Sequence, residues 1–390
     1  MTELPADFRL PDYDGASLRA VMPAALDAVG APTTSHGRSS AADRELLGLP
    51  RARKACVVLI DGLGAQLLAQ RGGHAPFLRG LRPDSLTLTS GYPSTTAASL
   101  TMFGTGCVPG QTGMLGYSVR NPADGRLLNL VSWEDATVAP RDWQPADTLV
   151  EQLGVESWGR RVTSVGPSRF IGSGLTEAAL RGPRFVAGDS LADRVDATCE
   201  LLRGADTDLV YLYWGDVDKV GHQQGWGSSA WGEAVELVDA ELSRLASRLP
   251  RGTLLLVTAD HGMIDLAADS RVDVAEVPEL ARDVTLVAGE PRASHVHTLP
   301  GRAEAVAARW RDVLEDSAWV LLREEAEAFG LFGPLSERHR ATVGDVVVAA
   351  RGSRAVVDSR TQTAASIALV GVHGSLTPQE LEIPLLRLVV

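Results

Sequence analysis

The chain has little of what would favour export, membrane insertion or a disulfide-stapled fold. Its 390 residues include three cysteines, Cys56, Cys107 and Cys199, which are too few and too widely spaced for a disulfide framework or a thiolate zinc site. The N-terminus has no basic segment followed by an apolar one, and no run of about 18 apolar residues occurs. We therefore expect reduced thiols, a cytoplasmic location and no membrane span.

Positive charge is also scarce. Lys54 and Lys219 are the only lysines, and the formal net charge is -12. Proteins that act as nucleic-acid scaffolds need a basic face that displaces counterions from phosphates, so this class is excluded. A small anionic substrate remains compatible with a local basic or metal-bearing pocket, and the sequence does not indicate an oligomeric state.

What the sequence does contain is the pattern of an α/β fold. Three short apolar runs end in a carboxylate-bearing turn: 55–60 before Asp61, 208–213 before Asp216, and 253–258 before Asp260. Each predicts a strand buried on both faces. The apolar spacing over 230–249 predicts a helix between two of them. This alternation predicts a doubly wound, mostly parallel central sheet flanked by helices, with ligands at the carboxyl ends of its strands.

The rhythm of the pattern divides the chain into parts. We interpret residues 1–50 as an N-terminal arm packed on the core, residues 51–270 and 361–390 as a metallohydrolase core, and residues 271–360 as an inserted α+β cap. Helices are expected in the cap at 302–315 and 323–328, and strands at 319–322 and 343–350. Residues 366–374 are expected to return to the core as a strand that ends in a polar turn.

Candidate metal ligands lie at these strand ends. Asp61 follows an apolar run, and Asp260 and His261 follow another, where a bending chain can direct both side chains to one ion. Asp218 and His222 are four residues apart, so a helical turn places them on one face. His373 ends a further apolar run before Gly374. Each signal alone is also typical of an ordinary turn or helix surface, so the prediction depends on their coincidence.

A hydroxyl-rich segment completes the set. Pro93 and the following Ser94, Thr95 and Thr96 are typical of a loop that caps a helix, and small and apolar residues continue to Gly104. A threonine there lies beside unpaired helix N–H groups, where a phosphate is favoured. All five signals fit the same edge of one sheet, which predicts a single site.

These residues resemble the nucleotide pyrophosphatase/phosphodiesterase branch of the alkaline phosphatase superfamily. The likeness covers about 55–265 and 366–386 and includes Pro93–x–x–Thr96, Asp218–x–x–Gly221–His222, Asp260–His261 and the Gly371–x–His373–Gly374 turn. It implies a Thr96 nucleophile and two divalent ions, zinc or alternatively manganese or iron. One ion is expected on Asp218, His222 and His373, and the other on Asp61, Asp260, His261 and the Thr96 oxygen.

The resemblance implies a hydrolase, of phosphodiesterase type, acting on a small phosphate ester. Where family members often carry an asparagine, this chain has Ser99, so Ser99 and the Ala97 N–H are the expected phosphoryl contacts. His295 and His297 alternate at strand spacing and could line the substrate entrance or replace His373. A phosphomonoesterase, another phosphoryl or phosphonate hydrolase, and an inactive metal-binding protein remain open alternatives.

Overall fold

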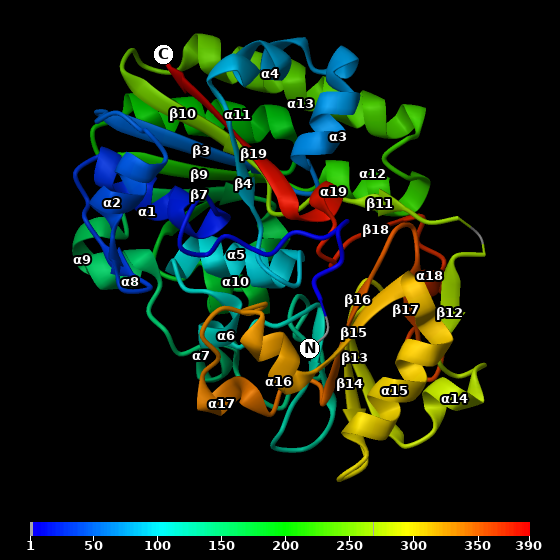
Figure 1. Cartoon of the computed structure of the whole chain (residues 1–390). Helices are drawn as coiled ribbons and strands as arrows, with labels where there is room; N and C mark the ends of the chain where they lie inside the picture. The colour runs from blue at the N-terminus through cyan, green and yellow to red at the C-terminus, as the bar shows by residue number, and fades with distance from the viewer. Residues whose placement is uncertain (1–2, 268) are drawn as a thin grey trace.

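The computed structural model describes residues 3–267 and 269–390, and its centre is a seven-stranded sheet in the order β4–β19–β10–β3–β9–β7–β8 (Figure 1). The strands β10, β3, β9, β7 and β8 are mutually parallel, whereas β19 is antiparallel to both of its neighbours. This confirms the predicted mostly parallel α/β sheet. The bounds of the seven strands are β3 (Lys54–Ile60), β4 (Leu86–Thr89), β7 (Val162–Gly166), β8 (Arg184–Ala187), β9 (Leu209–Trp214), β10 (Thr253–Thr258) and β19 (Glu382–Val389).

The middle of the sheet is buried on both faces because its strands are almost continuously apolar. All six residues of β10 and six of the seven in β3 are buried. In the register, Ile60 pairs with Trp214 and Leu59 pairs with Thr258, so the carboxyl ends of β3, β9 and β10 lie level with one another. The polar residues that follow these strands therefore leave the sheet at one edge.

Helices cover both faces of this sheet (Figure 1). On one face lie α11 and α13, and on the other lie α1, α5 and α10. The predicted helix at 230–249 is observed as α13, whose buried Trp231, Val235, Val238, Leu242 and Leu245 recur at helical spacing. The bounds are α1 (Val21–Ala28), α2 (Ser40–Leu46), α3 (Ala65–Gln70), α4 (Pro76–Leu81), α5 (Thr96–Thr105), α10 (Gly174–Ala179), α11 (Leu191–Arg203), α12 (Asp216–Gln224) and α13 (Ser229–Arg248).

A second, four-stranded antiparallel sheet has the order β13–β14–β16–β15. Its own apolar cluster includes Trp310, Val296, Val320 and Val346, all buried. The division of the chain into arm, core and cap stays a prediction. The elements here are β12 (Arg271–Asp273), α14 (Pro278–Ala281), β13 (Val284–Glu290), β14 (Ala293–Thr298), α15 (Ala303–Leu314), β15 (Ala318–Leu322), α16 (Arg323–Ala328), α17 (Glu337–Arg340), β16 (Val346–Ala350) and β17 (Ala355–Val357).

Shorter elements connect these layers. Residues 1–50, expected to be an arm, contain α1, whose eight residues are all buried, and an Arg19–Asp43 ion pair of 2.9 Å that is fully buried. The remaining elements are η1 (Leu18–Ala20), β1 (Thr34–Ser35), β2 (Arg38–Ser39), η2 (Gly72–His74), η3 (Arg82–Asp84), α6 (Pro109–Thr112), β5 (Ser118–Arg120), β6 (Leu127–Asn129), α7 (Pro140–Trp143), α8 (Leu149–Leu153), α9 (Val155–Trp158), η4 (Ser168–Phe170), η5 (Glu315–Ser317) and α19 (Pro378–Leu381).

The expectation of a core strand over 366–374 is wrong. This segment contains the end of a short helix, α18 (Ala364–Ile367), and the two-residue strand β18 (Gly371–Val372). β18 pairs with β11 (Ile264–Asp265) outside the central sheet. Gly371 and Gly374 flank a stretch too short for a full strand, and the C-terminal core strand is β19. The error concerns the strand alone, because His373 still follows the extended residues.

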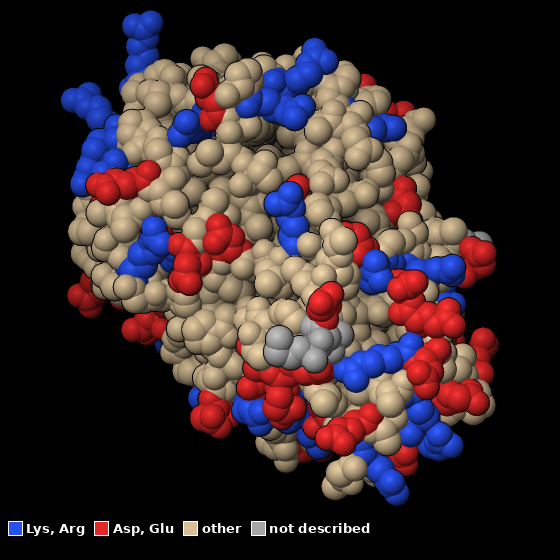
Figure 2. Space-filling model, in the orientation of Figure 1, with Lys and Arg blue, Asp and Glu red and all other residues tan. Residues whose placement is uncertain are grey.

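Charged side chains of both signs lie on the surface of the protein. On the face in Figure 2, acidic and basic side chains are interspersed, and many of them gather over the lower part of the view, where α14–α17 lie. Among residues 3–267 and 269–390, no helix combines the length and apolar character needed to cross a membrane.

Candidate active site

Six of the predicted side chains meet at the carboxyl edge of the central sheet. Asp61 follows β3, Asp260 and His261 follow β10, and α12 after β9 carries Asp218 and His222. Residues separated by up to 200 positions are thus brought together because parallel strands end at the same edge. His373 reaches the same place from the turn after β18.

The first candidate metal group consists of Asp218, His222 and His373, whose ligand atoms lie within 4.8 Å of one another. The expected helical spacing is observed, with Asp218 Oδ2 3.2 Å from His222 Nε2 on α12. Asp218 Oδ1 is 3.9 Å from His373 Nε2. This is the ligand set that the resemblance implied for one ion.

The second candidate group consists of Asp61, Asp218 and His261, under the same 4.8 Å limit. Asp61 Oδ1 lies 3.4 Å, and Asp260 Oδ2 lies 3.5 Å, from His261 Nε2. Asp218 belongs to both groups, so the two groups adjoin. They are consistent with the bimetallic site of the family.

Each histidine of the site is oriented from behind by the backbone. The Nδ1 atoms of His222, His261 and His373 lie 2.7, 2.9 and 2.8 Å from the carbonyl oxygens of Gly371, Gly262 and Ser94. A carbonyl accepts only, so each Nδ1 donates its proton and Nε2 faces the carboxylates with a lone pair in the neutral ring. Metal-binding histidines are held in this way.

The carboxylates provide the test of whether a cation fits. Asp61 Oδ1, Asp218 Oδ1 and Asp260 Oδ2 are buried without a hydrogen-bond partner among the described residues. Buried charged oxygens that lack a partner are costly, and a divalent cation would satisfy all three. The mixed carboxylate and imidazole donors suit zinc, manganese or iron.

The pKa values reflect the same crowding of negative charge. Burial raises the pKa of Asp61 well above its ordinary value, and the charges of Asp260 and Asp218 raise it further. Burial favours a higher pKa at Asp218 too, but the charge of His222 lowers it below its ordinary range. Burial opposes protonation of His222, yet Asp218 raises its pKa to about 9. A bound cation would take the place of these protons.

Thr96 is the first residue of α5 and is half-buried. Its Oγ1 lies 3.3 Å from His261 Nε2, which places the hydroxyl beside the second candidate group. The loop before it is fixed to the turn that carries His373, because Ser94 N–H donates to the Gly374 carbonyl and Ser94 Oγ donates to the Ser375 carbonyl. Helix start and imidazole are therefore positioned by one set of contacts.

Three of the four predicted substrate contacts, Ser99, His295 and His297, do not line the cavity beside the site. Ser99 is buried with its Oγ 2.9 Å from Ser90 Oγ, and Ser90 in turn donates to the Asp260 carbonyl. Neither Ser99 nor Ala97 lines the cavity described below. Ser99 sits one turn into α5, where its side chain points back toward the strand ends and supports Asp260 from behind. The N–H group of Ala97 lies in the first turn of α5.

His295 and His297 lie on β14 in the second sheet. His295 Nε2 donates to the Leu115 carbonyl at 2.8 Å, while its Nδ1 accepts from Gly344 N–H at 3.2 Å. Burial lowers the pKa of His295 to about 4 and that of His297 to about 3. Neither side chain lines the cavity, so the expectation that they border the substrate entrance or replace His373 is wrong.

A cavity of about 540 Å³ opens beside Thr96. Asp61, Asp218, His222 and His373 lie on its wall. Two tyrosines of β9 that were not predicted from the sequence, Tyr211 and Tyr213, also line it. Tyr213 donates to Asp61 Oδ2 at 2.5 Å and so holds this candidate ligand. Alternation within the predicted strand 208–213 puts both tyrosines on one face, which was the available signal.

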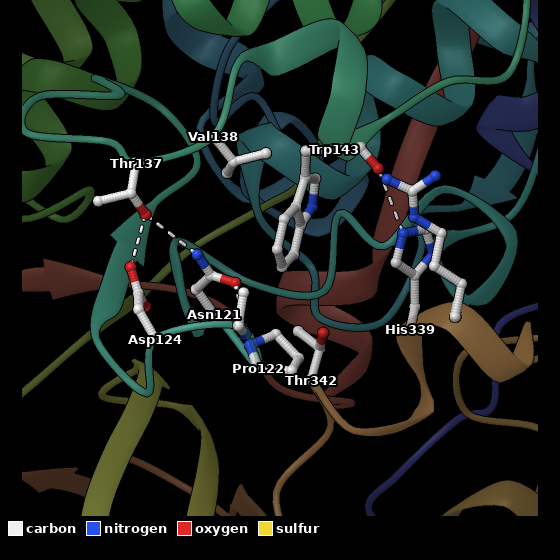
Figure 3. Close-up of a pocket in the computed structure, with 10 residues that line it drawn as sticks. Asn121, Pro122, Asp124, Thr137, Val138, Trp143, His339 and Thr342 are labelled. Atoms are coloured by element: carbon white, nitrogen blue, oxygen red, sulfur yellow. Dashed lines mark hydrogen bonds between the residues drawn. The ribbon is translucent and has the colours of Figure 1, made fainter.

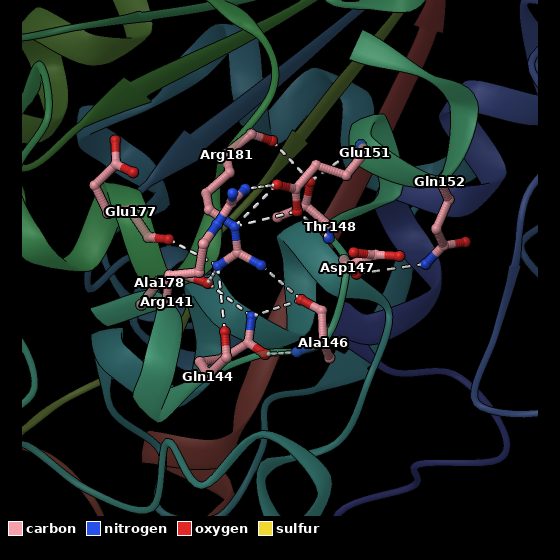
Figure 4. Close-up of polar contacts among 10 residues, drawn as sticks. All are labelled: Arg141, Gln144, Ala146, Asp147, Thr148, Glu151, Gln152, Glu177, Ala178 and Arg181. Carbon is pink, nitrogen blue, oxygen red and sulfur yellow. Dashed lines mark hydrogen bonds and ion pairs between the residues drawn. The ribbon is translucent and has the colours of Figure 1, made fainter. Parts of the chain in front are cut away.

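Leu175, Thr176 and Leu180, from α10 and its C-cap, also line the cavity, and the buried Arg181 follows them directly in the chain. Figure 4 shows the Arg181 side chain surrounded by its acceptors. Its guanidinium donates to Glu151 and to the carbonyls of Gln144, Ala146, Glu177 and Ala178. With Arg181 buried, this network fixes the loop before α8 against α10.

A second cavity, of about 480 Å³, lies elsewhere and is lined by Asn121, Trp143, His339 and Thr342 among others (Figure 3). It contains none of the predicted ligands. His339 there lies 3.2 Å from the Trp143 carbonyl, and Asn121 Nδ2 donates to Thr137 Oγ1. Of these two cavities, the one beside Thr96 is therefore the one that borders the candidate metal groups.

Comparisons with known proteins agree with this geometry. A murine ectonucleotide pyrophosphatase/phosphodiesterase 5 has a similar structure, with a TM-score of 0.66 at 18% identity, over 85% of this chain and 87% of that one. A phosphonoacetate hydrolase from Sinorhizobium meliloti, solved with phosphonoformate, has a TM-score of 0.68 at 22% identity, over 91% of this chain and 92% of that one. At these identities the likeness concerns the fold.

At the level of sequence, a phosphopentomutase from Anaeromyxobacter sp. (strain K) is 34% identical over 143 residues, which is 36% of this chain and 33% of that protein. The match thus spans about a third of that relative's length. The model of the family described as type I phosphodiesterase / nucleotide pyrophosphatase matches residues 55–376. Because this segment covers most of the chain and contains every converging side chain from Asp61 to His373, the protein belongs to this family of phosphoester hydrolases, within the alkaline phosphatase superfamily.

Proposed function

We propose that the protein is a metal-dependent phosphodiesterase in which Thr96 is the nucleophile and two divalent ions, zinc in the first instance, lie in the two adjoining groups. The observation that carries the proposal is the Thr96 hydroxyl at a helix start, 3.3 Å from His261 Nε2 and on the wall of the cavity. One ion would be held by Asp218, His222 and His373. The other would be held by Asp61, Asp260, His261 and the Thr96 oxygen, with Asp218 also within reach of it.

When bound, the ions would lower the pKa of the Thr96 hydroxyl and offset the charge that develops on the attacking and leaving oxygens. The chain's own residues supply the positioning. Backbone carbonyls aim the three imidazoles, Tyr213 holds Asp61, and the first N–H groups of α5 face the phosphoryl oxygens. Thr96 Oγ1 then forms a bond to phosphorus as the ester oxygen leaves, and water later cleaves the phosphothreonine.

The substrate class is a small phosphate ester, and the preference for diesters rests on charge. Among the residues that line the cavity, Arg169 is the only lysine or arginine. A terminal phosphate dianion needs more positive charge than a diester does. The murine relative has been solved as an inactive variant with AMP, which supports an ester of this general size. A cytoplasmic location remains part of the proposal.

The experiment is the Thr96→Ala variant assayed on bis-p-nitrophenyl phosphate and p-nitrophenyl phosphate after zinc loading. We expect turnover of the diester to fall at least about a hundredfold because the covalent step is lost, with metal content and folding retained. Thr96→Ser is the matched control and should keep a large part of the activity. Full activity of Thr96→Ala would exclude the nucleophile, a faster monoester reaction would favour a phosphomonoesterase, and metal binding without any turnover would favour an inactive protein.

A further inference from the structure

Tyr211 is a buried tyrosine whose hydroxyl has no assigned role. It lies in the middle of β9, its ring packs on Phe103 with the ring centroids 4.9 Å apart, and its side chain lines the cavity beside Thr96. The residue is 3% exposed, and among the described residues its hydroxyl has no hydrogen-bond partner. A buried hydroxyl without a partner destabilises the protein unless water or a ligand pairs with it.

The cavity contains two other buried polar atoms of this kind, and both have an explanation. Asp61 Oδ1 and Asp218 Oδ1 are buried and have no hydrogen-bond partner in the described part of the chain, and both belong to the candidate metal groups. Tyr211 is different because it is neutral. Burial, and after it the charges of Asp260 and Asp61, raise the pKa of Tyr211 well above its ordinary value, so the hydroxyl keeps its proton and can donate at neutral pH. A metal cation cannot accept a hydrogen bond from this hydroxyl, whereas a substrate with an acceptor atom can.

The surroundings of Tyr211 define what kind of group it would meet. Besides the candidate ligands and several polar side chains, the cavity is lined by the apolar side chains of Leu100, Val165, Leu175, Leu180 and Phe185. A hydrogen-bond donor that lies among apolar side chains discriminates strongly between substrates. A bound group without an acceptor displaces water and leaves the hydroxyl unpaired. A group with an acceptor at that point restores the hydrogen bond.

We propose that Tyr211 is a substrate-recognition residue, and that the organic group retained on phosphorus is a compact, largely apolar ring or chain that carries a hydrogen-bond acceptor for the Tyr211 hydroxyl. The proposal rests on the function proposed above and narrows its substrate class. Tyr213, two residues along the strand, donates a hydrogen bond to Asp61, while Tyr211 would donate one to the organic group of the substrate. Of the two tyrosines of β9, one thus stabilises the metal site and the other selects the substrate.

The test compares Tyr211→Phe with the wild type, because this change removes only the hydroxyl and keeps the packing on Phe103. The probes are the p-nitrophenyl esters of phenylphosphonate, pyridin-3-ylphosphonate and pyridin-4-ylphosphonate, which share a leaving group and differ by one acceptor nitrogen. For at least one pyridyl ester, we expect the ratio of its kcat/KM to that of the phenyl ester to fall about tenfold in Tyr211→Phe. Using the ratio removes differences in intrinsic reactivity among the esters.

Tyr92→Phe is the matched control. Tyr92 is also buried with a hydroxyl that lacks a partner among the described residues, but it does not line the cavity, so its loss should leave the ratio unchanged. An unchanged ratio in Tyr211→Phe for both pyridyl esters would overturn the proposal. An equal loss with all three esters would overturn it too, because the hydroxyl would then contact the shared phosphonate.

A binding measurement separates this inference from the proposed chemistry. Titration calorimetry of zinc-loaded Thr96→Ala, with and without Tyr211→Phe, gives the affinities of the three free phosphonates. The pyridyl advantage should fall about tenfold with Tyr211→Phe here as well. If the wild type hydrolyses none of the esters, the proposed function fails, and the calorimetric comparison still decides the role of Tyr211.

Discussion

Histidines in two regions of this protein have opposite properties in the fold. At the edge of the central sheet, His222 has a pKa raised to about 9 because Asp218 outweighs the effect of burial. In the second sheet, burial lowers the pKa of His295 to about 4. His222 keeps one ring nitrogen directed at a carboxylate, whereas both nitrogens of His295 are used by the backbone. A buried histidine in this protein is therefore a candidate ligand only where carboxylates converge on it.

The largest effect expected from this contrast is on metal content. His373→Ala should lower bound zinc by about one equivalent per chain and abolish most of the diesterase activity, because it removes one of three donors in its group. His295→Ala is the matched control from the second sheet and should leave zinc content unchanged. Elemental analysis of the two purified variants decides between them. Equal zinc content in both would exclude His373 as a ligand.

The next effect concerns the contact between the two regions. Arg292, at the start of β14, donates to Glu380 at 2.6 Å, and both side chains are fully buried. Glu380 also accepts from Ser375 N–H, in the turn that carries His373. Arg292→Met should lower the free energy of unfolding by about 3 kcal/mol, because it leaves a buried carboxylate unpaired. Urea denaturation of the metal-free protein measures this loss.

An exposed ion pair provides the control for that measurement. Arg340→Met removes a half-exposed guanidinium that pairs with the exposed Glu324 and with Glu327, and should cost at most about 1 kcal/mol. If Arg292→Met destabilises the protein no more than Arg340→Met does, the buried pair does not brace the turn of His373.

The smallest effect is on pH dependence. The pKa of His222 is raised above its ordinary value in the metal-free protein, so His222 stays protonated until the pH approaches about 9 and must release its proton to bind zinc. Zinc affinity should therefore rise by up to about tenfold per pH unit between pH 6.5 and 9. Asp218→Asn removes the charge that raises this pKa, and titrations in competition with a chelator should show a flatter profile alongside weaker binding. An equally steep profile in the variant would contradict the coupling.

Much of the site could be predicted from the sequence because its signals are local. Asp61 and Asp260 directly follow apolar runs, and Asp218 and His222 share a helical turn, so each residue's place in its element was readable. Thr96 was expected at a helix start and is found there. Assignment of Ser99 to the substrate failed because one turn of α5 directs its side chain toward Ser90, and the sequence alone does not fix the azimuth of that helix.

The sequence by itself determined the central elements, because β3 and β10 are apolar enough to be buried on both faces and α13 has a regular apolar stripe. It also determined which residues can act as ligands or as a nucleophile. Only the tertiary structure decided that β19 rather than 366–374 completes the sheet, that His295 and His297 are buried on β14 away from the cavity, and that Tyr211 and Tyr213 line the cavity. These outcomes depend on contacts between residues far apart in the chain, and local spacing carries no information about such contacts.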